Sequence, residues 1–356
     1  MVSMRKVDQH FWKGKRVFLT GHTGFKGSWM SLWLHSMGAI VKGFSLEPNT
    51  NPSLYKILSL DALIHSEIGD IRDLSALKAS VLSFKPEIVI HMAAQPLVRY
   101  SYNEPLETYS TNVMGTANVL EAIRLFDTVR AVVVVTTDKV YENKEWPWGF
   151  RENEPLGGYD PYSSSKACAE LVTAAYRQSF FSSNDAPSIA TARAGNVIGG
   201  GDWSQDRLIP DAIKAFEENK PLVIRNPSAT RPWQHVLEPL SGYLMLAESL
   251  FTEGKRFAQS WNFGPGDKDC KSVKLILDDL VKIWGRDASW VLEQAAQPHE
   301  ANFLKLDCSK AKFELNWNPR WEVSSALQMI VSWHKAFRSG LNMKDVCFEE
   351  IKNYDQ

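Results

Sequence analysis

The sequence predicts an α/β protein with a doubly wound parallel sheet and a smaller C-terminal lobe, and three observations support this fold class. Short aliphatic runs alternate with longer helical stretches through the first half of the chain. A glycine-rich turn joins the first aliphatic run to the first helical stretch. After residue 193 the alternation fades, and Gly, Asn, Pro and Trp become frequent. Alternating strands and helices are typical of a parallel sheet with helices on both faces.

The alternation predicts the following elements. A strand–helix–strand unit is predicted at residues 16–20, 25–37 and 39–44, because a helical stretch separates two short aliphatic runs there. Further strands are predicted at residues 63–65, 87–91, 131–137 and 189–193. Further helices are predicted at residues 74–82, 109–126, 161–180, 208–218 and 236–250.

The composition is that of a globular protein without a strong global charge. Hydrophobic residues make up 44% of the 356 residues and charged residues 23%, which is enough apolar surface to build a large core. The 40 basic and 41 acidic side chains give a formal net charge of -1. Since no net charge attracts nucleic acid or an anionic membrane, we expect neither as a partner, and local groups must hold any anionic ligand.

The cysteines and the apolar runs indicate a cytoplasmic protein. The four cysteines are far apart and form no CxxC pair, which argues against a metal site and a disulfide framework: Cys168, Cys270, Cys308 and Cys347. We expect them to be buried thiols in a reducing compartment. The N-terminal segment lacks the continuous apolar core of a signal peptide. The longest aliphatic run, residues 131–135, is too short to cross a bilayer.

The turn at residues 20–27 reads Thr-Gly-His-Thr-Gly-Phe-Lys-Gly and directly follows the first predicted strand. Glycines at this position permit a tight turn and let the backbone approach a pyrophosphate, while the following helix supplies oriented N–H groups. The alternative is an ordinary glycine-rich connection, but the strand–turn–helix context favours a Rossmann-type dinucleotide site. The residues predicted to bind the dinucleotide are Gly21, Thr23, Gly24, Phe25, Lys26 and Gly27.

The end of the second predicted strand leaves the type of dinucleotide open. A carboxylate that holds the adenosine ribose is expected at the end of the second strand, but Phe44 is followed by Ser45. This position alone therefore does not decide between NAD and NADP. Asp70 follows the third strand, where its carboxylate would accept from an adenine amino group. Alternatively, this acidic segment only caps the helix that begins after Asp73.

Tyr162 and Lys166 form a YxxxK pair within a predicted helix. Spacing of four residues places both side chains on one helix face. A positive charge beside the phenol favours the phenolate, so we expect the lysine to bring the tyrosine pKa from about 10 toward neutrality. The tyrosine is then a base for a hydroxyl proton.

A second polar cluster, Thr137-Asp138-Lys139, ends the central aliphatic strand. Taken alone, these residues could simply terminate a strand and leave a solvated lysine. Active-site groups of parallel sheets gather at this edge, however, and the YxxxK pair is expected there too. The predicted catalytic set is therefore Thr137, Asp138, Lys139, Tyr162 and Lys166.

Nearly end to end, the chain resembles the extended short-chain dehydrogenases of the nucleotide-sugar 4,6-dehydratase group. The resemblance rests on residues 20–27, on His-Met-Ala-Ala-Gln at 91–95, on Thr-Asn-Val-Met-Gly-Thr at 111–116, and on 137–141 with the YxxxK pair. It implies NAD as cofactor. Together with the turn, the implied cofactor-binding residues are Asp70, Ile71, Ala93, Ala94, Gln95, Asn112, Thr136, Tyr162 and Lys166.

Segments 193–203, 206–211 and 231–236 resemble more specifically the branch of this group that acts on CDP-glucose. The resemblance places Asn196, Arg207 and Arg231 beside the nucleotide sugar, where an amide and guanidinium groups suit phosphate oxygens. Many members carry Asp-Glu after the catalytic threonine, whereas this chain has Asp138-Lys139, as that branch does.

The resemblance implies conversion of CDP-D-glucose to CDP-4-keto-6-deoxy-D-glucose and water, with NAD reduced and reoxidised in each turnover. A nucleotide-sugar epimerase, a dehydratase of another nucleotide sugar and a non-catalytic dinucleotide-binding regulator are the alternatives. We expect residues 1–193, with 232–262 returning, to form the NAD-binding domain, and residues 194–231 and 263–356 to form the nucleotide-sugar-binding lobe. A homodimer or a dimer of dimers is expected, with contacts through residues 109–126 and 161–180.

The family comparison also predicts loose cofactor retention. Many members have a small residue and an aliphatic residue where this chain has His22 and Lys26. We expect the bulk of His22 to hinder the approach of the pyrophosphate to the turn, and Ser45 to hold the ribose less strongly than a carboxylate.

Overall fold

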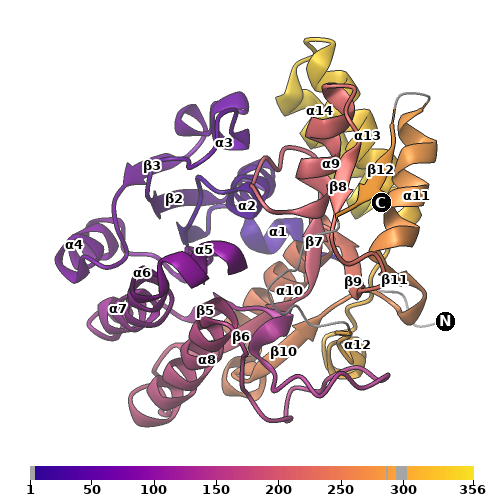
Figure 1. Cartoon of the computed structure of the whole chain (residues 1–356). Helices are drawn as coiled ribbons and strands as arrows, with labels where there is room; N and C mark the ends of the chain where they lie inside the picture. Colours follow the sequence, from indigo (N-terminus) through magenta and orange to yellow (C-terminus); the bar gives the residue numbers. More distant parts are fainter. Residues whose placement is uncertain (1–4, 286–287, 294–302) are drawn as a thin grey trace.

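A seven-stranded parallel sheet forms the centre of the computed structural model, which describes residues 5–285, 288–293 and 303–356. The strand order is β10-β6-β5-β4-β1-β2-β3 (Figure 1). The strands are β1 (Arg16–Thr20), β2 (Ile40–Ser45), β3 (His65–Ile68), β4 (Ile88–His91), β5 (Ala131–Val135), β6 (Ser188–Ala194) and β10 (Ser260–Phe263). The order reverses direction between β1 and β4, which is where doubly wound sheets bind ligands.

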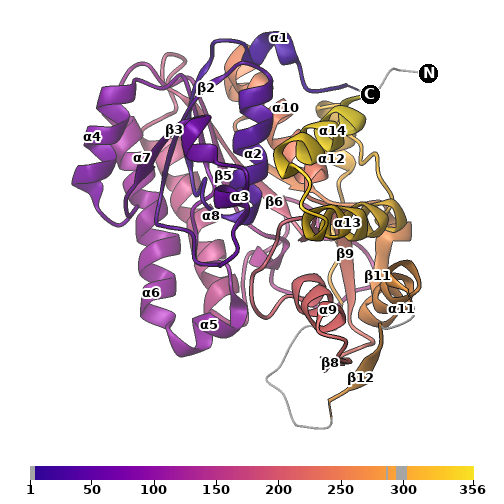
Figure 2. The ribbon, with the colours of Figure 1, turned by 90° about the horizontal axis from the view of Figure 1, so that it is seen from above.

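Helices cover both faces of the sheet, so the predicted fold class is confirmed (Figure 2). One face carries α4 (Leu74–Phe84), α7 (Gly115–Arg124) and α8 (Pro161–Ser179), and the other carries α2 (Phe25–Ser36) and α10 (Leu237–Glu253). Alternate residues of β1 serve the two faces: Val17 and Leu19 join one apolar cluster and Phe18 joins the other.

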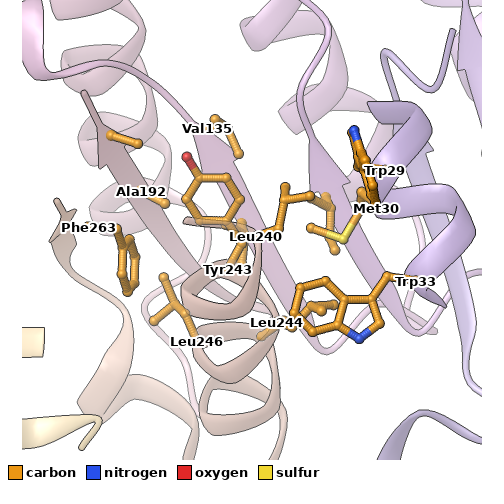
Figure 3. Packing of buried hydrophobic residues seen from close by; sticks show 14 of the residues in the cluster. Trp29, Met30, Trp33, Val135, Ala192, Leu240, Tyr243, Leu244, Leu246 and Phe263 are labelled. Carbon is orange, nitrogen blue, oxygen red and sulfur yellow. The ribbon is translucent and has the colours of Figure 1, made fainter. Parts of the chain in front are cut away.

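Large side chains fill the space between α2, α10 and the sheet (Figure 3). Met30 and Trp33 of α2 lie near Leu240 and Leu244 of α10. All four are fully buried. Burying one such side chain stabilises the fold by roughly 1.5–3 kcal/mol, so this contact fixes the start of α2 relative to α10.

A smaller lobe follows β6 in the chain. Its three-stranded sheet has the order β11 (Cys270–Ser272), β9 (Thr230–His235) and β7 (Asn196–Ile198). A separate two-stranded sheet pairs β8 (Leu222–Ile224) with β12 (Trp290–Leu292). Helices α9 (Leu208–Glu217), α11 (Val273–Trp284) and α13 (Val323–Arg338) enclose a separate apolar cluster with these strands. The remaining helices are α1 (Gln9–Trp12), α3 (Leu54–Ile57), α5 (Val98–Asn103), α6 (Pro105–Tyr109), α12 (Ser309–Glu314) and α14 (Met343–Asp355).

Two segments lie across the predicted division into domains. Residue 232, where the chain was expected to return to the first domain, lies inside β9 of the small sheet. The C-terminal helix α14 packs against α2, and its residues share the apolar cluster of the large sheet.

Element boundaries differ from the predictions at several places. The strand predicted at 63–65 is wrong, because the N–H groups of Leu63 and Ile64 bond to the Leu60 carbonyl in a helical turn, and the edge strand β3 begins only at His65. The central strand ends at Val135 rather than at 137. The helix predicted at 109–126 starts earlier, as α6, and contains a π-helical turn at Ser110–Met114.

In the described ranges, no helix is long and apolar enough to cross a bilayer.

Candidate active site

The glycine turn leaves the N-terminus of α2 without a side-chain cap at the switch point of the sheet. Gly21 has φ +81, and a Cβ atom there would lie 2.7 Å from the Ala93 backbone nitrogen. A Cβ atom on Gly27 would lie 1.9 Å from the Gly21 carbonyl oxygen. Gly24 is the N-cap of α2, and no side chain caps the helix. The N–H groups at this helix end are therefore available to an anionic group such as a pyrophosphate.

The ends of β1, β2 and β4 are tied together around this turn. The Thr20 hydroxyl oxygen accepts from the backbone nitrogens of Met92 and Ala93 at 3.1 Å. The Thr23 hydroxyl donates to the Leu46 carbonyl at 2.8 Å, so the Ser45 hydroxyl, 2.9 Å away, is the donor to Thr23. The polar group at the end of β2 is thus a hydroxyl that bonds to the turn itself.

The predicted adenine-side residues have partners within the protein. Both carboxylate oxygens of Asp70 accept from the Arg72 guanidinium, the shortest distance being 2.6 Å, and this contact lowers the Asp70 pKa. Asp73 caps α4 by accepting from the Ala76 nitrogen. The Ile71 side chain is buried, and a Cβ atom on Gly115 would collide with it.

His22 does not obstruct the turn, so that part of the cofactor prediction is wrong. Its ring is fully buried, and its Nε2 atom lies 2.7 Å from the Ser66 hydroxyl of β3. A Cβ atom on Gly43 of β2 would lie 2.3 Å from the ring. Burial lowers the His22 pKa to about 4, so the ring is neutral. The imidazole fills space beside β2 and Tyr55, because Gly43 leaves room for it.

Lys26 points toward the residues predicted to be catalytic. Its ammonium donates to the Tyr243 hydroxyl at 3.1 Å. Burial, together with the charges of Arg207 and Lys166, lowers the Lys26 pKa to about 7, although the charge of Asp138 acts in the opposite direction. This position beside the strand-end groups was not predicted from the sequence.

Helix α8 presents Tyr162 and Lys166 on one face, as predicted. Asp160 caps the helix, and the Lys166 ammonium donates to the Val135 carbonyl at 3.1 Å. Burial lowers the Lys166 pKa to about 8, although the negative charge of Glu170 acts to raise it. Burial also raises the Tyr162 pKa to about 12, although Thr137 and Arg207 lower it. The prediction that Lys166 brings this pKa toward neutrality is therefore wrong for the protein alone, since desolvation of the phenolate dominates.

The residues after β5 include a buried carboxyl group, that of Asp138, with one oxygen that has no hydrogen-bond partner in the described part of the chain. The Thr137 hydroxyl donates to Asp138 Oδ1 at 3.0 Å, and the Lys139 nitrogen donates to the same hydroxyl at 3.4 Å. Asp138 is 2% exposed, and its Oδ2 atom has no hydrogen-bond partner in the described part of the chain. Burial raises the Asp138 pKa, while Lys139, Thr137 and Arg231 lower it. A buried carboxyl with a raised pKa and a free oxygen is a candidate proton donor.

Asn112 and Thr136 face other protein groups. The Asn112 amide nitrogen donates to the Ser165 hydroxyl at 2.8 Å, and its oxygen accepts from the Gln95 nitrogen at 2.8 Å. The Thr136 hydroxyl donates to Glu170 Oε1 at 2.6 Å. These contacts join the loop after β4, which includes Ala94, to helix α8.

Two of the three predicted substrate residues lie near the acid–base groups. Arg231, on β9, lowers the Asp138 pKa, and Arg207, just before α9, lowers the Tyr162 pKa. Arg207 is held by the carboxylate of Asp202 at 3.2 Å. Asn196 lies on β7, opposite Trp233, and is half-buried.

Sequence reasoning missed Tyr243 and the buried pair of Glu170 and Arg193. Glu170 lies four residues after Lys166, so helical spacing was an available signal. Tyr243 is 217 positions from Lys26, and no local pattern relates them.

Two of the four cysteines, Cys308 and Cys347, are buried, and Cys168 and Cys270 are half-buried. Across the described residues, no group of His, Cys, Asp or Glu could hold a metal ion.

The doubly wound sheet, its glycine turn and the Tyr162–Lys166 pair define an extended short-chain dehydrogenase. Residues 18–330 match the family described as GDP-mannose 4,6 dehydratase, and the chain belongs to this family.

Individual relatives agree with this membership. The chain is 58% identical over 352 residues to CDP-glucose 4,6-dehydratase of Salmonella typhimurium, an alignment that covers 98% of each chain. The structure of Bacillus anthracis dTDP-glucose 4,6-dehydratase in complex with NAD has a TM-score of 0.75 at 22% identity and covers 93% of this chain and 100% of that one. Thermotoga maritima UDP-glucose 4-epimerase with UDP-glucose has a TM-score of 0.79 at 21% identity and covers 91% and 99%. The fold alone thus does not separate dehydratases from epimerases.

Proposed function

We propose that the protein is a CDP-glucose 4,6-dehydratase, which converts CDP-D-glucose to CDP-4-keto-6-deoxy-D-glucose and water with NAD as cofactor. The observation that carries this proposal is Asp138, a buried carboxyl with a raised pKa and an unpartnered oxygen, beside Tyr162 and Lys166. An epimerase needs the tyrosine and lysine but no acid for loss of a hydroxyl. The 58% identical relative supports cytidine as the nucleotide.

The uncapped N-terminus of α2 fits the pyrophosphate of NAD, and Gly21 and Gly27 allow the tight turn in front of it, because added Cβ atoms there would collide with the backbone of Ala93 and of Gly21. Residues from the turn and from the neighbouring strand ends would hold the dinucleotide: Gly21, Thr23, Gly24, Phe25, Lys26, Gly27, Asp70, Ile71, Ala93, Ala94, Gln95, Asn112, Thr136, Tyr162 and Lys166. Bound NAD would supply the hydride acceptor for sugar C4 and the hydride donor for C6, and its nicotinamide would add a positive charge to the site.

Oxidation at C4 requires a base for the O4 proton. Tyr162 Oη takes this proton, while the Thr137 hydroxyl and the ammonium of Lys166 stabilise the phenolate. In the protein alone, burial holds the Tyr162 pKa at about 12, so these groups must offset desolvation when substrate is bound.

The 4-ketone acidifies the C5 proton and permits elimination across C5 and C6. Lys139, or a group that it positions, takes the C5 proton, and Asp138 Oδ2 gives a proton to the departing O6 hydroxyl, which leaves as water. The raised pKa of Asp138 keeps this carboxyl protonated to a higher pH than an exposed aspartate. The diphosphate would be held by Arg207 and Arg231, with Asn196 as a polar neighbour.

The protein is further proposed to form a homodimer or a dimer of dimers in the cytoplasm. Four large apolar side chains on the helices predicted to form the contact are exposed by about half: Met114 57%, Leu125 48%, Leu171 58% and Phe180 51%. Covering them in a second copy would remove apolar area from water. The four free thiols suit a reducing compartment.

Product analysis tests the proposed function. Purified protein is incubated with NAD and, separately, with CDP-, dTDP-, UDP- and GDP-glucose, and the products are identified by mass spectrometry and NMR. We expect a 4-keto-6-deoxy sugar, formed with highest kcat/KM from the cytidine donor. A C4 epimer, or equal rates with all four donors, would contradict the assignment.

A further inference from the structure

A buried ion pair lies next to the catalytic groups, and the proposed mechanism does not use it. Glu170 is on α8 and Arg193 is on β6, and each side chain is 2% exposed. The Nε and Nη2 atoms of Arg193 donate to the two Glu170 oxygens at 2.8 and 2.9 Å. Desolvating two charges is costly, and buried pairs are weak sources of stability. A role for the charges themselves therefore has to be considered.

Glu170 connects this pair to the end of the central strand. Its Oε1 atom accepts from the Thr136 hydroxyl at 2.6 Å, and Thr136 directly precedes Thr137. Its Oε2 atom accepts from the Thr191 hydroxyl of β6 at 2.6 Å. The two carboxylate oxygens thus tie the end of β5 and the middle of β6 to helix α8.

Glu170 also acts on Lys166, one helical turn before it. Burial lowers the Lys166 pKa to about 8, and the charge of Glu170 raises it. From the other elements around Lys166, the facing groups are the Val135 carbonyl of β5, Lys26 of α2 and His91 of β4. His91, with a pKa lowered by burial to about 3, is neutral, and Lys26 brings no negative charge.

The Glu170 carboxylate is itself held in its charged form. Burial alone would raise its pKa, but Arg193 and the hydroxyl hydrogen bonds outweigh burial and lower it. Arg177 of α8 also faces Glu170, whose charge raises the pKa of this arginine while burial lowers it. Glu170 is therefore ionised at neutral pH and provides a fixed negative charge.

We propose that Glu170 is a positioning residue for the dehydratase reaction: it keeps Lys166 cationic and holds Thr136 so that Thr137 stays beside Tyr162. This role rests on the proposed function, because it assumes that charged Lys166 assists removal of the O4 proton. Glu170 itself touches no reacting atom.

The expected pH dependence follows from the sign of the charge on Lys166. Lysine is charged below its pKa, so its contribution to activity is present at low pH and is lost as pH rises through about 8. Without the Glu170 charge, this loss begins at lower pH. A nearby opposite charge typically shifts a pKa by about 1–3 units, so we expect the alkaline limb to move down by roughly one unit.

The test compares pH profiles of product formation from CDP-glucose. The main variant is Glu170→Gln/Arg193→Met, which removes both charges, keeps a side-chain oxygen that can accept from Thr136, and leaves no unpaired arginine. We expect near-parental activity at about pH 6 and roughly tenfold less above pH 9. The matched control is Thr191→Val, which removes one neutral hydrogen bond to Glu170 and should leave the shape of the profile unchanged. An equal loss at every pH would overturn the proposal.

A second measurement does not depend on turnover. NMR of isotope-labelled lysine reports the Lys166 pKa directly, with the signal identified by its loss in Lys166→Arg. Glu170→Gln, which has nearly the same shape and keeps one acceptor oxygen for Thr136, should lower this pKa, and Glu170→Asp should restore most of it. An unchanged Lys166 pKa overturns the proposal whatever the substrate. A lowered pKa in a protein that does not convert CDP-glucose would instead disprove the proposed function.

Discussion

Replacement of Asp138 by asparagine tests the assignment of the proton donor. Asp138 Oδ1 accepts from the Thr137 hydroxyl at 3.0 Å, and Oδ2 is unpartnered. Asparagine keeps an oxygen for Thr137 and has the same shape, so the variant should fold. What it lacks is a transferable proton.

The expected loss follows from that single change. Removing a positioned general acid typically lowers the rate by about 10²–10⁴-fold. Oxidation at C4 relies on Tyr162 and Lys166, so it should continue while elimination fails. In Asp138→Asn we therefore expect the reduced cofactor to accumulate with CDP-4-ketoglucose, which stopped-flow absorbance and mass spectrometry would detect.

The same variant has a predictable effect on stability. The Asp138 pKa is raised in the folded protein, so the unfolded chain releases this proton at lower pH. The parental free energy of unfolding should thus fall as pH rises from about 4, the unfolded pKa, through the folded pKa. Asp138→Asn should lack this fall and be at least as stable as the parent at neutral pH in urea titrations.

The control is Asp278→Asn, which makes the same chemical change on α11, where the carboxylate pairs with Lys274. It should leave turnover unchanged. Near-parental turnover of Asp138→Asn, or a block that also prevents C4 oxidation, would refute Asp138 as the acid for O6.

Three further predictions concern the base, the turn and the buried histidine. Tyr162→Phe should keep the circular dichroism of the parent and lose C4 oxidation; near-normal turnover would rule out Tyr162 as the base. Gly27→Ala places a methyl group 1.9 Å from the Gly21 carbonyl oxygen, so the turn must move. Calorimetry should then show NAD binding that is weaker by at least about tenfold, or about 1.4 kcal/mol. Unchanged affinity would contradict the turn as the pyrophosphate site. His22→Gly should cost about 3 kcal/mol of unfolding free energy by emptying a buried site, without tighter NAD binding; tighter binding would show that the ring hinders the cofactor.

Local sequence patterns were sufficient for the parts of the site that are near in sequence. The four-residue spacing of Tyr162 and Lys166 fixes their common helix face, and Asp138 follows a strand whose end is set by its aliphatic run. Because parallel strands end at one edge, these groups could be expected to meet before any coordinates were known.

Side-chain directions within the turn could not be predicted in this way. His22 turns under β2 because Gly43 leaves space there, and Lys26 reaches Tyr243 because α2 and α10 pack together. Both depend on contacts between distant parts of the chain. The tyrosine pKa was mispredicted for a related reason: spacing indicates the lysine charge, but the degree of burial, which dominates, follows only from the packed structure.

Transfer of a label within the substrate tests the central claim most directly. Purified protein with NAD is given CDP-glucose that carries deuterium at C4, and the product is analysed by NMR and mass spectrometry. The dehydratase account predicts CDP-4-keto-6-deoxyglucose with the deuterium at C6 and no net reduced cofactor. Loss of the deuterium to water, its retention at C4 of an epimer, or stoichiometric release of reduced NAD would contradict the account.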